Sequence, residues 1–259
     1  TGIATAYMDS TPLVAITAQV DSDLWGRDAF QETDIIGITM PITKHSFMVR
    51  DETQLASSLR QAFQLASTGR TGPVLVDIPK DILSAPCADQ PKRIPAAISK
   101  RLENPEQIER IAQALNRSER PVVIIGGGVK LGDACERTTE FVQKAQIPFV
   151  TTMMGIGSVA SANGFNLGFI GRPGNELANR TIHQADFILA LGTRFTERST
   201  SVIEEFAPLA TVAQIDIDPT SIGKNIKVDL AYEGDIQDAL TALIPLIVPH
   251  AREEWMGRI

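Results

Sequence analysis

Cysteine and histidine are scarce in this 259-residue sequence, which contains two of the first and three of the second. Cys87 and Cys135 lie far apart, and no cysteine or histidine pair has the spacing of a zinc site. The sequence therefore predicts no metal site within this chain. It also predicts two free thiols in a reducing compartment, which indicates the cytoplasm.

Basic residues are fewer than acidic ones: the chain has 24 Lys and Arg residues and 31 Asp and Glu residues, so its net charge is -7. An acidic chain is repelled by nucleic acid and by anionic lipid, so we expect neither nucleic acid nor a membrane as a partner. No apolar run reaches the roughly 20 residues that a membrane-spanning helix requires. A composition with 43% hydrophobic and 21% charged residues is typical of globular domains.

Apolar runs alternate with helical patterns along the chain. We expect strands at 13–17, 74–77, 122–125, 149–152, 187–191 and 212–217, and helices at 3–8, 28–37, 54–66, 105–115, 133–145, 175–183 and 235–246, with a glycine-rich loop at 155–174. Continuous apolar strands between helices are typical of parallel sheets covered on both faces. The sequence predicts an α/β fold with two open, doubly wound parallel-sheet domains.

The domain boundaries follow from composition and from element order. A stretch with three prolines and little apolar periodicity, at 86–103, predicts a linker between a domain at 1–85 and a second at 104–250. A helix precedes the first expected strand, whereas a parallel sheet normally has another strand before such a helix. We therefore expect the first domain to be truncated at its N-terminus.

Glycines and charged residues occur at the positions where the strands are expected to end. Lys80 follows the strand at 74–77, and four exits of the second domain carry Gly126-Gly127-Gly128, Gly155-Ile156-Gly157, Gly192-Thr193-Arg194 and Asp216-Ile217-Asp218. Each one alone is explained by a tight turn or a helix cap. Because strand ends of a parallel sheet share one edge, the four together favour a nucleotide-like ligand.

Two arginines in this region leave two interpretations open. Arg194 and Arg198 lie four residues apart after a buried strand, and a guanidinium group offers a forked donor to phosphate or carboxylate. Glu197 lies between them, so a surface ion pair with that carboxylate is the alternative.

Seven segments, in order along nearly the whole chain, resemble one enzyme family. They are TGIATAYMDSTPLVAITAQV, GRDAFQETDIIGIT, TKHSFMV, STGRTGPVLVDIPKDI, GGGV, LGTRFTER and IDIDPTSIGKN. They are similar to the large catalytic subunit of acetohydroxyacid synthase (acetolactate synthase), a thiamine-diphosphate enzyme family of branched-chain amino-acid biosynthesis. Departures from the family pattern include Ala18 in place of Gly and Phe169-Ile170 in place of Met-His.

The resemblance implies a domain plan with three parts. Residues 1–85 would be the C-terminal part of the domain that binds the pyrimidine of thiamine diphosphate, and 104–250 a central FAD-binding domain. Residues 251–259 would begin the linker to a C-terminal domain, absent from this chain, that holds the diphosphate and Mg²⁺. The chain alone is therefore expected to be inactive.

The resemblance also implies a reaction and partners. Pyruvate-derived hydroxyethyl-thiamine diphosphate would condense with a second 2-oxo acid, pyruvate or 2-oxobutyrate, to give acetolactate or acetohydroxybutyrate. The implied partners are these small acids, a second catalytic subunit in a homodimer or tetramer, and a regulatory small subunit. Two alternatives stay open: an FAD-containing relative such as pyruvate oxidase or glyoxylate carboligase, and a nucleotide-binding module without catalysis.

Site residues follow from the same resemblance. Active-site roles fall on Gln19, Phe30, Gln31, Lys80 and Arg198, the last of which would select the second 2-oxo acid. FAD-binding roles fall on Arg70, Gly126, Gly127, Gly128, Thr152, Met153, Met154, Gly168, Phe169, Ile170, Gly171, Thr193, Arg194, Arg198, Asp216, Ile217, Gly234 and Asp235.

Overall fold

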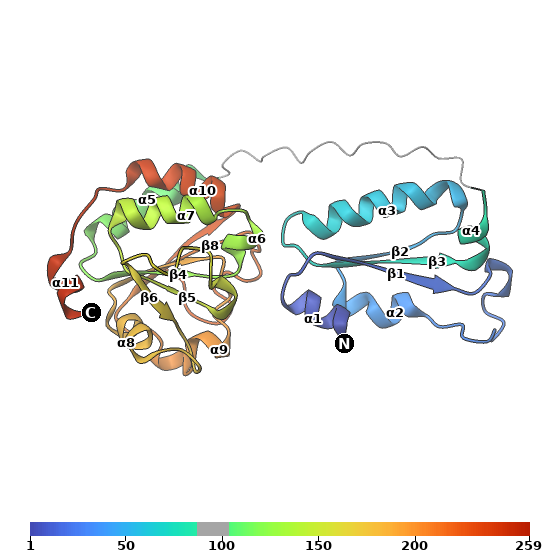
Figure 1. The fold of residues 1–259 in the computed structure, drawn as a ribbon, viewed down its shortest axis with the longest axis horizontal. Helices are drawn as coiled ribbons and strands as arrows, with labels where there is room; N and C mark the ends of the chain where they lie inside the picture. The colour runs from blue at the N-terminus through green and yellow to red at the C-terminus, as the bar shows by residue number, and fades with distance from the viewer. Residues whose placement is uncertain (87–103) are drawn as a thin grey trace. The chain divides into compact units, whose positions relative to one another are not determined.

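The computed structural model describes residues 1–86 and 104–259, which belong to two compact units (Figure 1). Unit 1 is assigned to 1–99 and unit 2 to 100–259. Apart from residue 86, the expected linker at 86–103 lies outside the described residues.

Unit 1 contains a three-stranded parallel sheet in the order β1-β3-β2. Its elements are α1 (Gly2–Met8), β1 (Leu13–Gln19), η1 (Ser22–Leu24), α2 (Ile35–Thr39), η2 (Met40–Ile42), β2 (His45–Met48), α3 (Glu52–Ser67), β3 (Pro73–Pro79) and α4 (Lys80–Ser84). Helix α3 covers one face of the sheet, and α1 and α2 cover the other (Figure 1). The central strand β3 is buried along its whole length, whereas Ile16 on the edge strand β1 is 60% exposed.

Unit 2 contains a six-stranded parallel sheet in the order β6-β5-β4-β7-β8-β9. Its strands are β4 (Pro121–Ile125), β5 (Phe149–Thr151), β6 (Asn166–Phe169), β7 (Phe187–Leu191), β8 (Thr211–Asp216) and β9 (Leu230–Glu233). Numbered within this sheet, the order is 3-2-1-4-5-6, which is that of doubly wound dinucleotide-binding sheets. The predicted fold class, α/β with two parallel sheets, is confirmed.

The helices of unit 2 form a layer on each face of this sheet. They are α5 (Pro105–Arg117), α6 (Gly128–Leu131), α7 (Cys135–Ala145), η3 (Met153–Gly155), α8 (Glu176–Gln184), α9 (Glu197–Thr200), η4 (Ile203–Glu205), α10 (Ile236–Leu243), η5 (Ile244–Leu246) and α11 (Glu253–Arg258). Helices α5, α7 and α10 lie on one face, with α8 and α9 on the other (Figure 1). Each layer has its own apolar core, built around Phe141 and Phe149 on the first face and around Phe195 and Trp255 on the second.

The expected helix at 28–37 is wrong over most of its length. Asp28 and Gln31 have positive φ angles of 54° and 67°, which a right-handed helix does not admit. The carboxylate of Glu32 accepts hydrogen bonds from the backbone N–H groups of Gly26 and Ala29, at 2.6 and 3.2 Å, and closes a loop instead. Helix α2 begins only after Asp34, which caps it.

Three strands of the structure, β2, β6 and β9, were not predicted from the sequence. The expected glycine-rich loop at 155–174 contains β6, and the expected last helix at 235–246 ends at Leu243 and continues as the 3₁₀ turn η5. All three strands are four residues long and lie at sheet edges, so none presents a continuous apolar run.

Across residues 1–86 and 104–259, no helix has both the length and the apolar character needed to cross a membrane.

Candidate functional site

The carboxyl ends of the six strands of unit 2 form one edge, and the expected FAD-binding residues of this unit lie along it. Following the order of the strands in the sheet, from β6 to β9, they are Gly168, Phe169, Ile170 and Gly171; Thr152, Met153 and Met154; Gly126, Gly127 and Gly128; Thr193 and Arg194; Asp216 and Ile217; and Gly234 and Asp235. Arg198 lies in α9, four residues after Arg194 in the sequence. The structure thus brings together at one edge residues that span more than a hundred positions of sequence.

The turns after β4 and β7 touch backbone to backbone at the centre of this edge. The N–H of Gly126 donates to the carbonyl of Leu191 at 2.8 Å, and the N–H of Gly128 donates to that of Gly192 at 3.1 Å. A Cβ atom on Gly126 would lie 2.1 Å from the Gly192 oxygen, and one on Gly128 would lie 2.7 Å from the Gly192 Cα. Packing alone therefore requires glycine at these two positions. This contact lies where the strand order reverses, the usual ligand crevice of such sheets.

Arg194 follows β7 at this crevice and is half-buried. Its carbonyl accepts a hydrogen bond from the side chain of Asn225 at 2.8 Å, which fixes the backbone. Glu197 pairs with Arg172 at 3.4 Å, not with Arg194 or Arg198. Within the described parts of the chain, the guanidinium groups of Arg194 and Arg198 have no acidic partner, so the ion-pair alternative fails for both.

A buried amide supports the same turn and was not foreseen from the sequence. Gln214 is fully buried within β8, and its Nε2 donates to the carbonyl of Thr193 at 3.0 Å and to that of Ser221 at 3.3 Å. Its Oε1 accepts from the N–H of Gly223 at 3.1 Å. The signal for this role was a single amide inside an otherwise apolar strand.

The exits of β5 and β6 differ in polarity and exposure. Met153 and Met154 are 61% and 52% exposed, so they offer apolar surface at the edge. Phe169 is partly exposed, whereas Ile170 is buried in the core on the α8 side. Asn179 fixes the next turn, because its side chain accepts from the N–H of Gly171 at 2.9 Å and donates to that residue's carbonyl at 3.0 Å.

Three carboxylates at the carboxyl ends of β8 and β9 stabilise turns and a helix N-terminus. Asp218 accepts from the N–H and hydroxyl of Thr220, at 3.0 and 2.7 Å, and forms a turn. Asp235 accepts from two N–H groups at the start of α10 and is its N-cap. Asp216 is buried and accepts from the Asp218 N–H at 3.0 Å. All three carboxylates therefore have structural roles at this edge.

Unit 1 has a separate candidate site at the carboxyl edge of its own sheet. Gln19 ends β1, Lys80 follows β3, and the loop that carries Phe30 and Gln31 is joined to β1 because Gln19 Nε2 donates to the carbonyl of Thr33 at 2.8 Å. Phe30 is 89% exposed and Lys80 is exposed as well. The structure therefore brings these four predicted residues to one edge of unit 1.

Hydrogen bonds to carboxylates shape the two loops of this edge. Those from the backbone of Gly26 and Ala29 hold the pKa of Glu32 below its ordinary value. The hydroxyl of Ser22 donates to Asp81 and lowers the pKa of that carboxyl, which ties η1 to the start of α4. Both carboxylates therefore stay ionised at neutral pH and keep the loops closed.

Asp77 is a buried residue of this site that sequence reasoning missed. It is 0% exposed, and its carboxylate accepts from the Thr17 hydroxyl at 2.7 Å and from Gln19 Nε2 at 3.3 Å. Gln19 Oε1 accepts from the N–H of Val20 at 2.9 Å, so the amide orientation is fixed at both of its ends. Asp77 thus positions Gln19, and its signal was a carboxylate inside an apolar strand.

Arg70 lies at the opposite, amino edge of the unit 1 sheet. Its Nε donates to the Ser10 hydroxyl at 3.0 Å, and its guanidinium lies 5.7 Å from the centre of the Tyr7 ring. These contacts hold the end of α1. The structure does not bring Arg70 together with Gln19 or Lys80, and its expected contact with FAD stays a prediction.

The sequence is similar to a family and to individual proteins of one kind. The family described as "Thiamine pyrophosphate enzyme, central domain" matches residues 108–243, which is more than half of the chain. The "Probable acetolactate synthase large subunit" of Methanocaldococcus jannaschii is 41% identical over 100% of this chain and 45% of its own length. The "Acetolactate synthase isozyme 3 large subunit" of Escherichia coli is 43% identical, over 100% of this chain and 46% of its own length.

The chain thus spans about half the length of the curated relatives it matches. The match to the family begins within α5 and ends with α10, so it includes all six strands whose carboxyl ends were described above. The fold, the strand order and the relatives agree, and this chain belongs to the thiamine pyrophosphate enzyme family.

Proposed function

We propose that the carboxyl edge of unit 2 binds FAD and that 104–250 is a central FAD-binding domain. The observation that carries this proposal is Arg194, a half-buried guanidinium without an acidic partner in the described structure, at the reversal point of a 3-2-1-4-5-6 sheet. A guanidinium there is suited to the diphosphate of a dinucleotide. Exposed Met153 and Met154 offer apolar surface to a flat ring.

Unit 1 is proposed to be part of the domain that binds the pyrimidine of thiamine diphosphate, over 1–85. Gln19, Phe30, Gln31 and Lys80 would line the place where this cofactor meets the substrate. The fixed Gln19 amide and the exposed Phe30 and Lys80 at one edge support this. Thiamine diphosphate, when bound, supplies the electron sink that decarboxylation of a 2-oxo acid requires.

The proposed activity of the whole protein is carboligation in branched-chain amino-acid biosynthesis. Pyruvate would be joined to a second pyruvate or to 2-oxobutyrate, giving acetolactate or acetohydroxybutyrate. Arg198 would orient the carboxylate that the second acid retains, because its guanidinium is exposed and has no acidic partner in the described chain. Mg²⁺ would bind outside this chain.

The proposal also covers assembly and location. The relatives are named "large subunit", which supports a small regulatory partner for this protein as well. A second catalytic subunit, in a homodimer or tetramer, and a cytoplasmic location remain predictions.

The first test removes the guanidinium of Arg194. In a protein with the full length of its relatives, Arg194→Ala should weaken FAD binding by about 1.5–3 kcal/mol, because a charge-assisted hydrogen bond is lost. Flavin fluorescence titration measures this affinity. Arg110→Ala is the matched control, since Arg110 is an exposed arginine of α5 whose guanidinium donates to Gln107 on the same helix. Equal FAD affinity in wild type and Arg194→Ala would contradict the proposed site.

The second test separates the acceptor role of Arg198 from the first half of the reaction. Arg198→Gln should raise the barrier to carboligation by roughly 2–4 kcal/mol, by analogy with the loss of one preorganised donor. Decarboxylation of the first pyruvate precedes acceptor binding and should suffer less. The ratio of acetohydroxyacid to acetaldehyde should therefore fall, and so should the preference for 2-oxobutyrate over pyruvate. If both stay at wild-type values, Arg198 does not orient the acceptor.

A further inference from the structure

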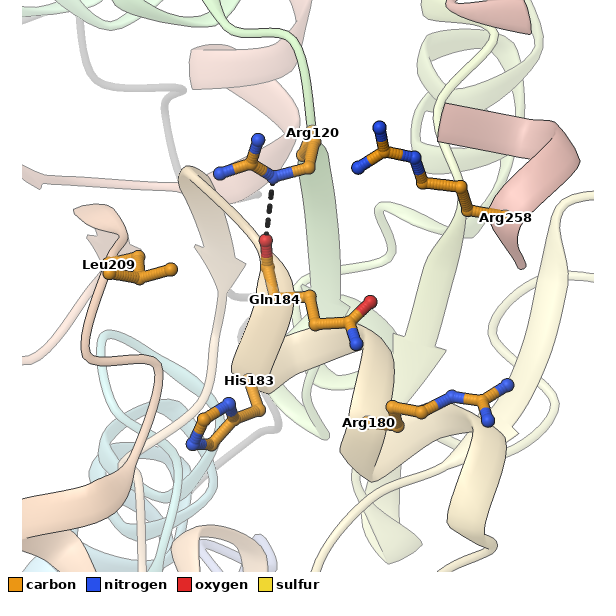
Figure 2. A pocket seen from close by; sticks show the side chains of 6 residues that line it. All are labelled: Arg120, Arg180, His183, Gln184, Leu209 and Arg258. Carbon is orange, nitrogen blue, oxygen red and sulfur yellow. Dashed lines mark hydrogen bonds between the residues drawn. The ribbon is translucent and has the colours of Figure 1, made fainter. Parts of the chain in front are cut away.

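A basic pocket lies at the amino edge of the unit 2 sheet, away from the cofactor edge. It is an open cavity of about 520 Å³, and its lining residues are Arg120, Arg180, His183, Gln184, Leu209 and Arg258 (Figure 2). Arg120 immediately precedes β4 and Leu209 precedes β8, while the other four come from α8 and α11. None of these residues has a part in the proposed FAD site.

The three arginines bring more positive charge than their neighbours offset. Arg258 pairs with Glu254 on the same helix, and both side chains are more than half exposed. Arg120 uses its Nε to donate to the Gln184 carbonyl at 2.8 Å, which leaves its two terminal nitrogens for another acceptor. The guanidinium of Arg180, which projects from α8, has no hydrogen bond or ion pair within residues 1–86 and 104–259. The pocket therefore holds an excess of positive charge on a chain whose net charge is -7.

One acid beside Arg120, the partly buried Asp186, offsets one of these positive charges. Glu254 offsets a second, so the three arginines still leave an excess of positive charge. Asp186, which precedes β7, accepts from the backbone N–H groups of Glu119 and Arg120, each at 2.9 Å. Asp186 therefore fixes the backbone at Arg120 and leaves the guanidinium free to project. Figure 2 shows the guanidinium groups of Arg120 and Arg258 above the side chain of Gln184, with the side chain of Arg180 extending to the right of it.

We propose that this basic pocket binds a compact oligoanion that carries two or more phosphate or carboxylate groups. Guanidinium groups recognise both through paired N–H donors, and three of them around one cavity suit a ligand with several charged oxygens. The Gln184 amide and the His183 ring add donors, and exposed Leu209 adds an apolar wall. The volume is in the range of small-molecule sites.

Inorganic pyrophosphate is the probe for this site. Calorimetric titration of the protein at low ionic strength should show saturable binding of one pyrophosphate at the pocket. Arg180→Gln should weaken that binding by about tenfold, as expected for one charge-assisted interaction. Leu209→Glu should abolish it, because this variant keeps all three arginines but places a carboxylate among them. Since Leu209 is 65% exposed, that substitution should not affect folding.

Two control variants locate the bound probe. Arg110→Gln removes the same charge from α5, on the other face of the sheet, and should leave the affinity within about twofold. Arg194→Gln removes a donor from the cofactor edge and should also leave it unchanged. If Arg194→Gln weakens pyrophosphate binding and Arg180→Gln does not, the probe is bound at the cofactor edge and the proposal is overturned.

The remaining outcomes are equally decisive. The proposal is overturned by a wild-type protein without saturable binding, or by equal losses in Arg180→Gln and Arg110→Gln, which would mean diffuse attraction to surface charge. Tighter binding of a hexaglutamate peptide than of pyrophosphate would identify an acidic protein segment as the occupant and would overturn it as well.

Discussion

Ser201 adopts a backbone conformation that side chains rarely tolerate. It ends α9 with φ 60° and ψ -107°, a region populated mainly by glycine. Such a residue costs of order 1–3 kcal/mol in the folded state. The strain lies three residues after Arg198, at the end of the helix that presents it.

Ser201→Gly should therefore stabilise the protein by about 1 kcal/mol, because the relief of strain exceeds the entropy that glycine adds to the unfolded chain. Chemical denaturation measures this change. Ser199→Gly is the matched control, since Ser199 is helical within α9 and glycine there should cost about 1 kcal/mol. A destabilised Ser201→Gly would mean that the hydroxyl makes a contribution larger than the strain.

Some residues of the two candidate sites could be predicted from a short sequence motif, and others could not. Lys80, Arg194 and the glycines after β4 follow apolar runs, so their place at a strand exit was predictable. Asp77 and Gln214 were not, because each acts through partners between 7 and 60 positions away in sequence, and spacing alone does not reveal those partners. These buried polar residues hold the loops and side chains of the two candidate sites in place.

At the scale of elements, the pairing of β8 with β9 depends on a carboxylate. Asp229 accepts from the N–H of Val212 at 3.0 Å and pairs with Lys227 at 3.1 Å, while its own N–H donates to the Val212 carbonyl. The hydrogen bond from Val212 is the main reason that the pKa of Asp229 lies below its ordinary value. A folded-state pKa below the unfolded one means that this contribution is complete above about pH 4 and disappears as the pH falls further.

Asp229→Asn should remove this part of the acid sensitivity. We expect a loss of about 1 kcal/mol at pH 7, and a smaller difference from wild type as the pH falls below 4. Urea denaturation at pH 7, 5 and 3.5 gives the comparison. Lys227→Gln is the control and should change stability by less than about 0.5 kcal/mol, because that lysine is 88% exposed. An identical pH profile for Asp229→Asn and wild type would contradict the linkage.

The strands that could be predicted are the central ones and the edge strand β1, whose segment 13–17 is mainly apolar. The segments that became β3, β4, β5, β7 and β8 are mainly apolar, because helices cover both of their faces. The strand β9 instead alternates between buried and exposed residues, and β2 is half-polar, so neither resembles a buried strand. The error at 28–37 arose from local backbone bonding by Glu32, which no hydrophobic period reveals.

At the scale of the whole molecule, the two units have separate apolar cores of different size. The core of unit 1 consists of Val49, Ala62, Ala66, Val74, Val76, Ile78 and Ile82, with partly buried neighbours. The cores of unit 2 comprise two larger clusters, drawn from residues 108–255 alone. Unit 2 therefore contains within itself the apolar surface that its sheet needs to bury.

A protein of residues 104–259 should thus fold alone and unfold in one cooperative transition. In the 259-residue chain, amides of β1 to β3 should exchange with solvent faster than those of β4, β7 and β8, because unit 1 buries less apolar surface. Hydrogen-exchange mass spectrometry measures both chains. A non-cooperative transition for 104–259, or slower exchange in unit 1, would be inconsistent with this division.

The contact between the turns after β4 and β7 has a consequence for how this protein tolerates sequence change. Gly126 and Gly128 meet Gly192 backbone to backbone, so a side chain at any one of the three displaces both turns. A compensating substitution at a neighbour cannot restore the fit, because a backbone atom cannot be made smaller. The three glycines therefore have to be retained together, and the parts of this edge that tolerate substitution best are exposed side chains beyond the contact, such as Met153 and Met154.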